Sequence, residues 1–416
     1  MLEYIKNIRK SEDNKTLLQN FAYLSICQVV SYVFPLITIP YLARVIGPDG
    51  FGKFAFAAAV VVWVQTIADW GFIYTATRDV AQNRNNKDTV SRIFSNVMWA
   101  QFLLTILSGI ILFIVVLFVP YFRKNADVIF ITFLMVPGHI LFPAWFFQAV
   151  ERMKFTTIFN LTIKLLFTVA VFLVIKEPDD YVLNPLLTSI GYVVCGICSQ
   201  YIILKKWGYR LYKPDWKGTL NAIKNSSDIF IYNLMPNLYN SFSVMLLGVW
   251  GDARANGIYD GGNKIPSIFY NLQNVLSRTF YPFLSRRYDK HRIYAIINIS
   301  VSIIGAIILL FISPFIINII LGPEFIDSVI IMQIMSISII FLAINDIYGT
   351  NYLILRHHER ELRNITTITS IIGMLVAVPS VYYFHAVGAA VTVCFSRVLL
   401  GFLSFIEYIK LKRNNQ

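Results

Sequence analysis

The chain has 416 residues, of which 56% are hydrophobic and 14% are charged. Soluble domains carry about 25% charged residues, so this composition excludes a soluble enzyme. The formal net charge is +13. Such an excess would suit nucleic acid, but membrane proteins also acquire it because Lys and Arg collect in their cytoplasmic loops.

Apolar runs of about 20 residues, the length that crosses a bilayer as a helix, follow one another along the chain. The first run begins near Leu17, is long and has no small-residue cleavage site, so we expect a membrane span and not a signal peptide. We predict an all-α polytopic membrane protein with twelve transmembrane helices, at roughly 17–41, 54–76, 97–119, 128–149, 155–175, 183–204, 229–250, 257–283, 294–319, 325–347, 365–384 and 386–408.

The distribution of basic residues predicts how these spans are oriented. With the N-terminus placed in the cytoplasm, 26 of the 36 Lys and Arg residues fall in the tails and loops on the cytoplasmic side, and six fall in the outer loops. Because basic residues favour the cytoplasmic side, both termini are predicted to be cytoplasmic. The same distribution accounts for the basic excess without a nucleic-acid partner.

The chain divides into two similar halves at its longest connector, 205–228, which is basic and aromatic. This connector suits an amphipathic segment on anionic lipid headgroups or a solvated linker. On either side of it, "RVIGPDGFGKFAFA" corresponds to "GVWGDARANGIYDGGNK", and "FTTIFNLTI" to "ITTITSIIG". We predict two six-helix lobes, 1–204 and 229–416, arranged as in transporters that carry a site between two repeats.

The stretch "RVIGPDGFGKF" at 44–54 is one residue short of a phosphate-binding loop, with Phe54 where Ser or Thr would hold magnesium. A true loop of this kind joins a strand to a helix in a soluble α/β domain. This one joins two predicted membrane helices. We interpret it as a helix-hairpin turn in which Gly47 ends one helix and Phe51 anchors at the membrane interface.

Charged residues within predicted spans are candidates for function, because each costs roughly 2.5–3.5 kcal/mol unless it faces a cavity or a partner. Lys164 and Arg397 lie near the midplane, one in each half, and Lys264 and Arg278 share the eighth span. Lys264 is four residues from an acid and could simply be neutralised by it. The acids are fewer than the cations, so the interior favours an anionic cargo; they are Asp69, Asp260 and Asp346.

No catalytic or metal-binding pattern can be read from the sequence. His139 is the one histidine near the centre of a predicted span; it could couple protons, although a lone histidine is more often a packed residue. Cys195 and Cys198 form a C-x-x-C on a predicted membrane helix, where packed small residues are the simpler interpretation than redox or metal chemistry. We therefore expect no catalytic residue, metal or organic cofactor.

Prolines within the predicted spans are candidate hinges, because a membrane helix tolerates proline where a cavity or neighbouring groups satisfy the carbonyls that it frees. They are Pro35, Pro40, Pro137, Pro143, Pro266 and Pro282.

Taken together and in order, several motifs resemble those of the O-antigen and polysaccharide-unit flippases. "SYVFPLITIPYLARVIGPDGFGKFAFA" is similar to that family's Pro-Leu-x-x-x-Pro-Tyr-Leu-x-Arg segment and the glycine turn that follows it. "ADWGFIYTATRDVA" and "FPAWFFQAVERMKFTTI" are similar to two further segments, with Trp70, Ile73, Tyr74 and Ala149 as departures. "GNKIPSIF", "YPFLSR", "LGPEFIDSVIIMQIMS" and "NDIYGTNYLI" match the second half in order.

The resemblance implies a multidrug/oligosaccharidyl-lipid/polysaccharide exporter fold, similar to that of MATE transporters, and a transporter instead of an enzyme. The implied activity is to move an undecaprenyl-pyrophosphate-linked sugar unit from the cytoplasmic to the periplasmic leaflet of the bacterial inner membrane by alternating access. The resemblance also implies contacts with membrane lipids. It implies two protein partners, the polysaccharide polymerase and the chain-length regulator.

On this interpretation, the cations within the spans neutralise the pyrophosphate, and two further arginines lie at the rims of the cavity. The cation set is Lys164, Lys264, Arg278 and Arg397, with Arg44 and Arg78 at the rims. The candidates for coupling to H+ or Na+, or for gating, are Asp69, Asp346, Asp260 and His139.

Three other functions remain open at this point. A drug or metabolite exporter on the same fold would favour acids in its cavity, because such cargo is often cationic. A membrane polymerase would carry a large outer loop, and an acyltransferase a membrane-embedded histidine with a polar partner, for which His139 is the candidate. A structural scaffold would have little reason to keep unpaired cations in mid-span.

Overall fold

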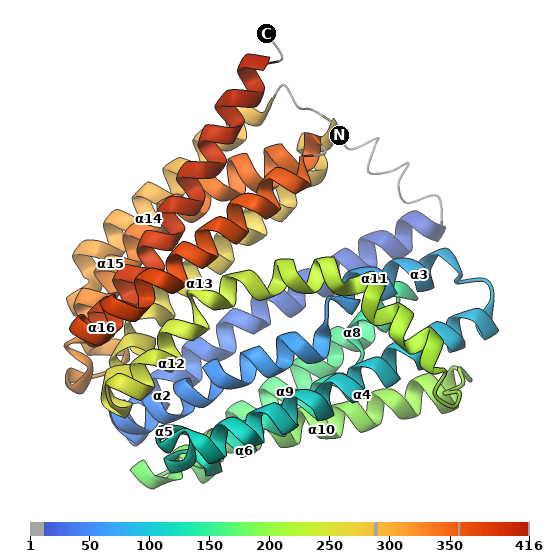
Figure 1. The fold of residues 1–416 in the computed structure, drawn as a ribbon, viewed down its shortest axis with the longest axis horizontal. Helices are drawn as coiled ribbons and strands as arrows, with labels where there is room; N and C mark the ends of the chain where they lie inside the picture. The colour runs from blue at the N-terminus through green and yellow to red at the C-terminus, as the bar shows by residue number, and fades with distance from the viewer. Residues whose placement is uncertain (1–11, 287–289, 357, 415–416) are drawn as a thin grey trace. The chain divides into compact units, whose positions relative to one another are not determined.

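The computed structural model describes residues 12–286, 290–356 and 358–414, and every regular element in this part of the chain is a helix (Figure 1). Among these residues, eight helical segments are long and apolar enough to cross a membrane. The predicted class, an all-α polytopic membrane protein, is confirmed. The chain forms two compact units: residues up to Leu42 with Val61–Ile231, and Ala43–Val60 with Tyr232 onward. The predicted lobe limits remain a prediction.

The first unit contains most of α2 and the eleven elements that follow it. Their bounds are α2 (Glu12–Asp69), α3 (Phe72–Gln82), α4 (Lys87–Phe118), α5 (Pro120–Lys124), α6 (Ala126–Phe133), α7 (Met135–Leu141), α8 (Ala144–Ala149), α9 (Met153–Val174), η1 (Pro178–Val182), α10 (Leu183–Tyr201), η2 (Ile202–Lys206) and α11 (Trp216–Leu234).

The second unit contains the middle of α2 and the rest of the chain, with α14, α15 and α16 packed side by side (Figure 1). The bounds are η3 (Met235–Leu238), α12 (Ser241–Trp250), α13 (Ala253–Arg286), α14 (His291–Ile320), η5 (Pro323–Phe325), α15 (Ser328–Asn345), η6 (Asp346–Leu353), η7 (Ile354–Arg356) and α16 (Glu359–Asn414).

Two long helices each join two predicted spans at a single residue with a left-handed backbone, although the second span, 54–76, is interrupted after Asp69 and continues in α3. In α2 that residue is Gly47, with φ of 63°, a conformation that glycine adopts without a steric penalty. In α16 it is His385, with φ of 46°. Just beyond it, a Cβ on Gly388 would lie 1.9 Å from the backbone oxygen of Ser380, so the reversal requires glycine at this position. Splitting both helices at these residues is consistent with the predicted span count.

The turn at Gly47 is packed more tightly than the sequence predicts. Phe51, expected at the membrane interface, is instead fully buried, with its ring edge-on to Phe325 at 5.7 Å between centroids. The prediction that Phe51 anchors at the membrane interface is therefore wrong, because the residues after Gly47 pack against other helices of the second unit. A Cβ on Gly52 would lie 1.6 Å from the backbone oxygen of Ala253, which places two helix backbones in direct contact.

The predicted fourth span is not one helix but three short ones, α6, α7 and α8. The first break is at Leu134 and the second at Phe142–Pro143. Pro137 lies in the first turn of α7. Backbone N–H groups in a first turn have no acceptor within the helix, so the absence of an N–H on proline costs no hydrogen bond there. By contrast, Pro35 lies inside α2 and does not break it, because the non-helical residue of this helix is Gly47. Two others also lie within continuous helices, namely Pro40 in α2 and Pro266 in α13.

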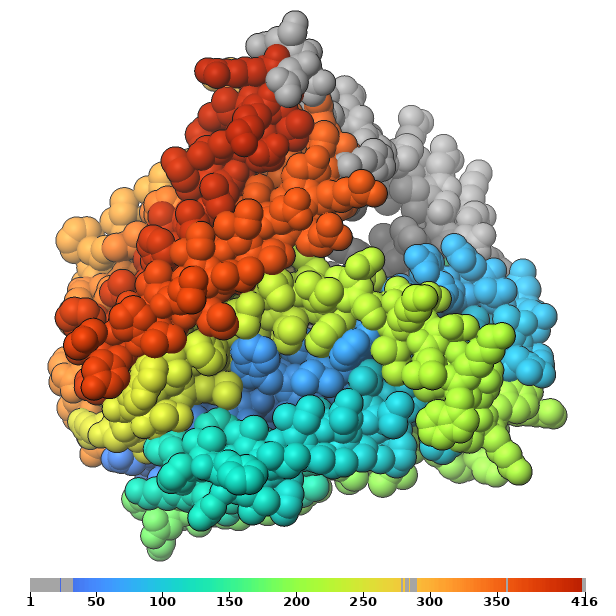
Figure 2. All heavy atoms as spheres, viewed as in Figure 1, coloured from blue at the N-terminus to red at the C-terminus, as the bar shows by residue number. Residues whose placement is uncertain are grey.

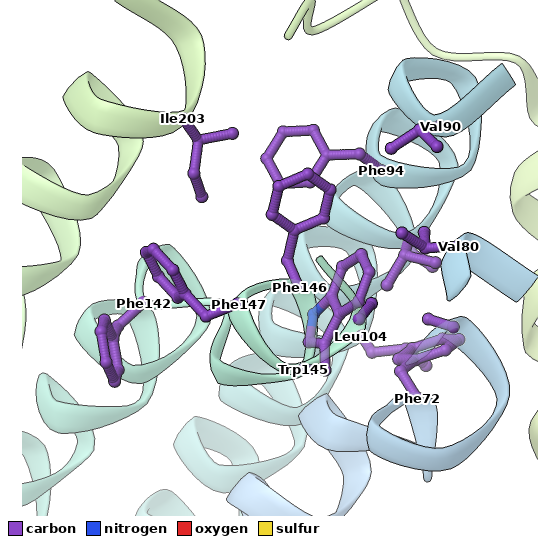
Figure 3. Close-up of a cluster of buried hydrophobic side chains, with 14 residues drawn as sticks. Phe72, Val80, Val90, Phe94, Leu104, Phe142, Trp145, Phe146, Phe147 and Ile203 are labelled. Atoms are coloured by element: carbon purple, nitrogen blue, oxygen red, sulfur yellow. The ribbon is translucent and has the colours of Figure 1, made fainter. Parts of the chain in front are cut away.

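An aromatic cluster forms a core of the first unit where α3, α4 and α8 meet (Figure 3). Phe94 and Phe146 are fully buried, with ring centroids 4.9 Å apart. Phe146 also meets Tyr209 edge-on at 5.0 Å, so the segment after η2 joins the same core. Aromatic side chains bury large apolar areas, and this cluster holds the short helix α8 in place despite its six residues.

Candidate functional site

Two of the predicted coupling residues meet in the first unit. His139 Nε2 lies 3.4 Å from Asp69 Oδ1, and the two side chains are 29% and 38% exposed. Asp69 is the last residue of α2, and the next two residues, Trp70 and Gly71, have φ of 42° and 80°. His139 lies in α7, between the two breaks of the fourth span. The sequence suggested these residues separately, and the structure brings them together at interruptions of two helices.

Close backbone packing fixes the position of His139. A Cβ on the adjacent Gly138 would lie 2.6 Å from the backbone nitrogen of Val193 in α10, so α7 and α10 touch backbone to backbone. The carbonyl of Leu141, freed at the second break, accepts hydrogen bonds from Ser199 Oγ and Gln200 Nε2, both at 2.8 Å. Small residues and satisfied carbonyls therefore hold this short helix rigidly against its neighbour.

The break that follows Asp69 is held by α11, a helix that begins within the predicted linker. Trp70 stacks on Phe230 with ring centroids 3.8 Å apart, and its indole nitrogen donates to Ile223 O at 3.0 Å. Thr75 and Ser226 form a buried hydrogen bond of 2.7 Å between α3 and α11. The side chains of α11 lie along those of α3 in the space-filling view (Figure 2). The Asp69 carboxylate is thus presented at a locked helix junction.

Arg397 is the central cation of the second unit. Its Nη1 donates to Ser338 Oγ at 2.9 Å, and the side chain is half-buried on α16. The guanidinium interacts electrostatically with the buried phenols of Tyr239 and Tyr259. A neutral set of partners leaves the positive charge uncompensated by these contacts, so this site can attract an anion. The sequence predicted the cation but not which tyrosines surround it.

Lys264 already has a negative partner. Its Nζ lies 2.8 Å from Asp260 Oδ2, one helical turn away, and 5.7 Å from the ring centroid of Phe51. Of the two interpretations that the sequence left open for this pair, mutual neutralisation describes the geometry.

A buried polar network, which the sequence analysis missed, connects α13, α14 and η6 in the second unit. Gln273 Nε2 donates to Asn298 Oδ1 at 2.6 Å, and Asn298 Nδ2 donates to Tyr294 OH at 2.8 Å. Asn351 Nδ2 reaches the same phenol at 3.0 Å. All four side chains are at least 97% buried. The signal was present in the sequence, because Tyr294 and Asn298 are four residues apart on one helix face.

Asp346 lies at the start of η6, beside this network, and is 4% exposed. This segment is a π-helix, a geometry that often marks functional sites. Asn351, five residues later, donates a further bond to the backbone oxygen of Asp346 at 3.0 Å. The side-chain oxygens Oε1 of Gln273 and Oδ1 of Asn351 accept no hydrogen bond within the described protein. The network therefore has spare acceptors next to a buried carboxylate, which suits a cation or a proton donor.

The remaining predicted site residues have more ordinary surroundings. Arg44 donates to Ile319 O at the C-terminal end of α14, where a cation complements the helix dipole. Arg78 is exposed and pairs with Asp79 at 3.0 Å. Lys164 is half-buried in α9. The side chains of Arg278 and Pro282 lie outside the described residues.

Neither a metal centre nor a thiol site is visible in the described part of the chain. It contains no group of three or more His, Cys, Asp or Glu side chains that could hold a metal ion. Cys195 and Cys198 are both unbridged, the first buried and the second exposed.

Comparisons with known proteins place these features in a family context. A family model for polysaccharide biosynthesis proteins matches residues 17–288. A protein of Escherichia coli (strain K12), named as a candidate O-antigen transporter, is 26% identical over 406 residues, covering 95% of this chain and 98% of that protein. A protein of Shigella dysenteriae with the same name is 26% identical over 390 residues, covering 92% and 97%.

Solved structures share the fold at low sequence identity. The lipid II flippase MurJ, in an inward closed conformation, matches with a TM-score of 0.70 and 11% identity, covering 94% of this chain and 87% of that one. The MATE transporter VcmN of Vibrio cholerae matches with a TM-score of 0.58 and 12% identity, covering 96% and 97%. The expected MATE-like exporter fold is therefore confirmed.

Proposed function

Because this chain belongs to the family of polysaccharide biosynthesis proteins, we propose that it is a flippase for lipid-linked polysaccharide units. The cargo is an undecaprenyl-pyrophosphate-linked oligosaccharide, moved from the cytoplasmic to the periplasmic leaflet of the bacterial inner membrane. The observation that carries this proposal is the end-to-end similarity to the E. coli O-antigen transporter candidate, at 98% of its length. Both termini are cytoplasmic on this proposal, as the basic loops predict.

The chemistry of the cargo agrees with the charges in the spans. A pyrophosphate cannot cross hydrocarbon unaided, whereas its isoprenoid tail can stay in lipid. Arg397 is the best-placed contact for the anion. Its hydroxyl and phenol neighbours are neutral, so they do not balance its positive charge. Lys164 is the corresponding cation of the first unit. Lys264 contributes less, because Asp260 already balances it.

We propose that the Asp69–His139 pair is the site at which proton binding is coupled to transport. A carboxylate and an imidazole 3.4 Å apart in a membrane protein can exchange a proton between them and with water. Protonation changes the net charge of this helix junction and so biases one state of the alternating-access cycle. Asp346, beside the amide oxygens of Gln273 and Asn351 that accept no hydrogen bond within the described protein, is the corresponding candidate if sodium drives transport. The polymerase and chain-length regulator remain the proposed protein partners.

Complementation tests the function directly. Expressed in flippase-deficient bacteria that make different repeat units, the unaltered chain should restore surface polysaccharide in at least one strain. Arg397→Ala should lower that polysaccharide by about tenfold or more, because the anion loses its contact. Arg413→Ala, which removes an exposed arginine of the same helix, should leave it unchanged.

Two outcomes would overturn the proposal or this assignment. Restoration in no strain, at normal expression, would remove the flippase function; drug resistance conferred by the same chain would then favour the small-molecule exporter. Full polysaccharide with Arg397→Ala would remove this arginine from the transport pathway.

A further inference from the structure

A hollow of about 560 Å³ opens on the first unit between α4 and the broken pair α6–α7. Eleven of its twelve lining residues are apolar or glycine. The exception, Thr105, donates its hydroxyl to Gln101 O at 2.7 Å, so it presents no unsatisfied polar group. Phe102, Ile110 and Phe113 line it and remain 54%, 52% and 53% exposed. We call this hollow the α4 groove.

Local structure explains why the α4 groove exists. A Cβ on Gly109 would lie 3.0 Å from the ring of Phe133, so glycine on α4 leaves room for this side chain of α6. The helix then breaks at Leu134, and α7 continues in contact with α10 through Gly138. The short helix α7 contacts both α4 and α10, and its packing on α10 is the more extensive. The groove lies over the seam between α4 and the two short helices α6 and α7.

The length of the α4 groove indicates what occupies it. Its lining on α4 runs from Met98 to Phe113, a rise of about 22 Å at 1.5 Å per residue. One leaflet contributes about 15 Å of hydrocarbon, half of the ~30 Å core. A single fatty acyl chain therefore does not fill the groove. The isoprenoid tail of an undecaprenyl carrier is longer than an acyl chain and can extend past the midplane.

Charge at the start of α4 agrees with an anionic lipid. Arg92 is six residues before Met98, about 9 Å along the helix, and its guanidinium lies 5.4 Å from the ring of Tyr212 while it pairs with Asp88. Lys87 lies 5.5 Å from the ring of Tyr209. The connector that brings these tyrosines here also carries further basic residues, namely Lys205, Lys206, Arg210 and Lys213. An apolar groove thus begins beside a basic surface, as a lipid with an anionic head requires.

We propose that the α4 groove binds the isoprenoid tail of the transported lipid on the outer surface of the first unit. This inference rests on the proposed function, because it takes the cargo class from there. It adds a tail-binding site that is separate from the cations assigned to the pyrophosphate. The tail slides along the groove across the midplane while the head passes through the protein.

Paired tryptophan substitutions on α4 test the groove. Ile110 and Ile111 are 52% and 48% exposed at the same depth, but only Ile110 lines the groove. Ile106 and Leu107 form a second such pair, at 46% and 50%. The purified chain is placed in phosphatidylethanolamine–phosphatidylglycerol vesicles with undecaprenyl phosphate carrying a diazirine in its tail. Irradiation should label α4, α6 and α7. Ile110→Trp and Ile106→Trp should lower labelling by about tenfold, and Ile111→Trp and Leu107→Trp should not.

The outcomes separate this proposal from the proposed function. Equal labelling of both members of each pair would overturn the groove as the tail site. The same conclusion would follow if labelling by a diazirine-bearing phosphatidylglycerol fell as much with Ile110→Trp as labelling by the isoprenoid does. Complementation by the unaltered chain is measured in parallel. Restored polysaccharide with no groove-dependent labelling would leave the flippase standing without this site. Groove-dependent labelling without complementation would support the tail-binding groove but assign the protein a different cargo.

Discussion

At the scale of single residues, the charged side chains within predicted spans acquire meaning from their partners. Asp69 and His139 are 70 positions apart in the sequence, yet their side chains lie 3.4 Å apart. Lys264 is balanced within one turn of its own helix, whereas Arg397 donates to a neutral hydroxyl and interacts electrostatically with buried phenols. Residues of the same charge in similar runs of sequence therefore have different partners in the fold.

Replacing Asp69 tests its role in proton coupling. Asp69→Asn keeps the size of the side chain but removes the charge that pairs with His139. In vesicles containing the purified chain and a lipid-linked oligosaccharide, it should reduce the stimulation of transport by an imposed pH gradient about tenfold. Asp79→Asn, an exposed aspartate of α3 paired with Arg78, is the matched control and should keep the full response. A pH response that survives intact in Asp69→Asn would exclude the pair as the proton site.

At the scale of elements, glycines decide how closely helices approach. In the second unit, the segment after Gly47 crosses the start of α13. A Cβ on Gly257 would lie 1.9 Å from Pro48 O, and one on Gly52 would lie 1.6 Å from Ala253 O. The near-match to a nucleotide loop at 44–54 is thus explained: its second glycine serves a helix crossing, and Phe54 belongs to the helix.

Substitution of Gly52 tests this crossing. Gly52→Leu must separate two backbones, so we expect a loss of stability of about 1–3 kcal/mol, the usual effect of overpacking. The measurement is thermal unfolding of the purified chain in detergent. Ala58→Leu, at an exposed position on the same helix, should unfold like the unaltered chain. Lys53→Ala, next to Gly52, should leave transport near normal. Unchanged unfolding of Gly52→Leu would contradict the crossing.

At the scale of the whole molecule, the hydropathy of the chain and the distribution of Lys and Arg predict a membrane protein with a defined orientation. Eight described segments have the length and composition of membrane spans. The excess of basic residues in one set of loops predicts which ends face the cytoplasm. These properties sum over many residues, so no single contact decides them.

Cysteine labelling in intact cells tests the orientation. Lys124, the last residue of α5, is predicted to face outward, and Lys154, early in α9, to face the cytoplasm; both are exposed. In a cysteine-free background, Lys124→Cys should react with a membrane-impermeant maleimide on whole cells. Lys154→Cys should react only after the cells are permeabilised. The opposite pattern would reverse the orientation.

By itself, the sequence determined the all-helical membrane class, the approximate spans and the turn at Gly47, because these depend on local hydropathy and backbone preference. Only the tertiary structure decided that the fourth span breaks into three helices, that Phe51 is buried, and that Gln273, Asn298 and Asn351 form a network around Tyr294. These features arise where distant segments meet. In the hydrocarbon region each freed carbonyl and polar side chain must find a partner, and the sequence does not state which partner the fold will bring to it.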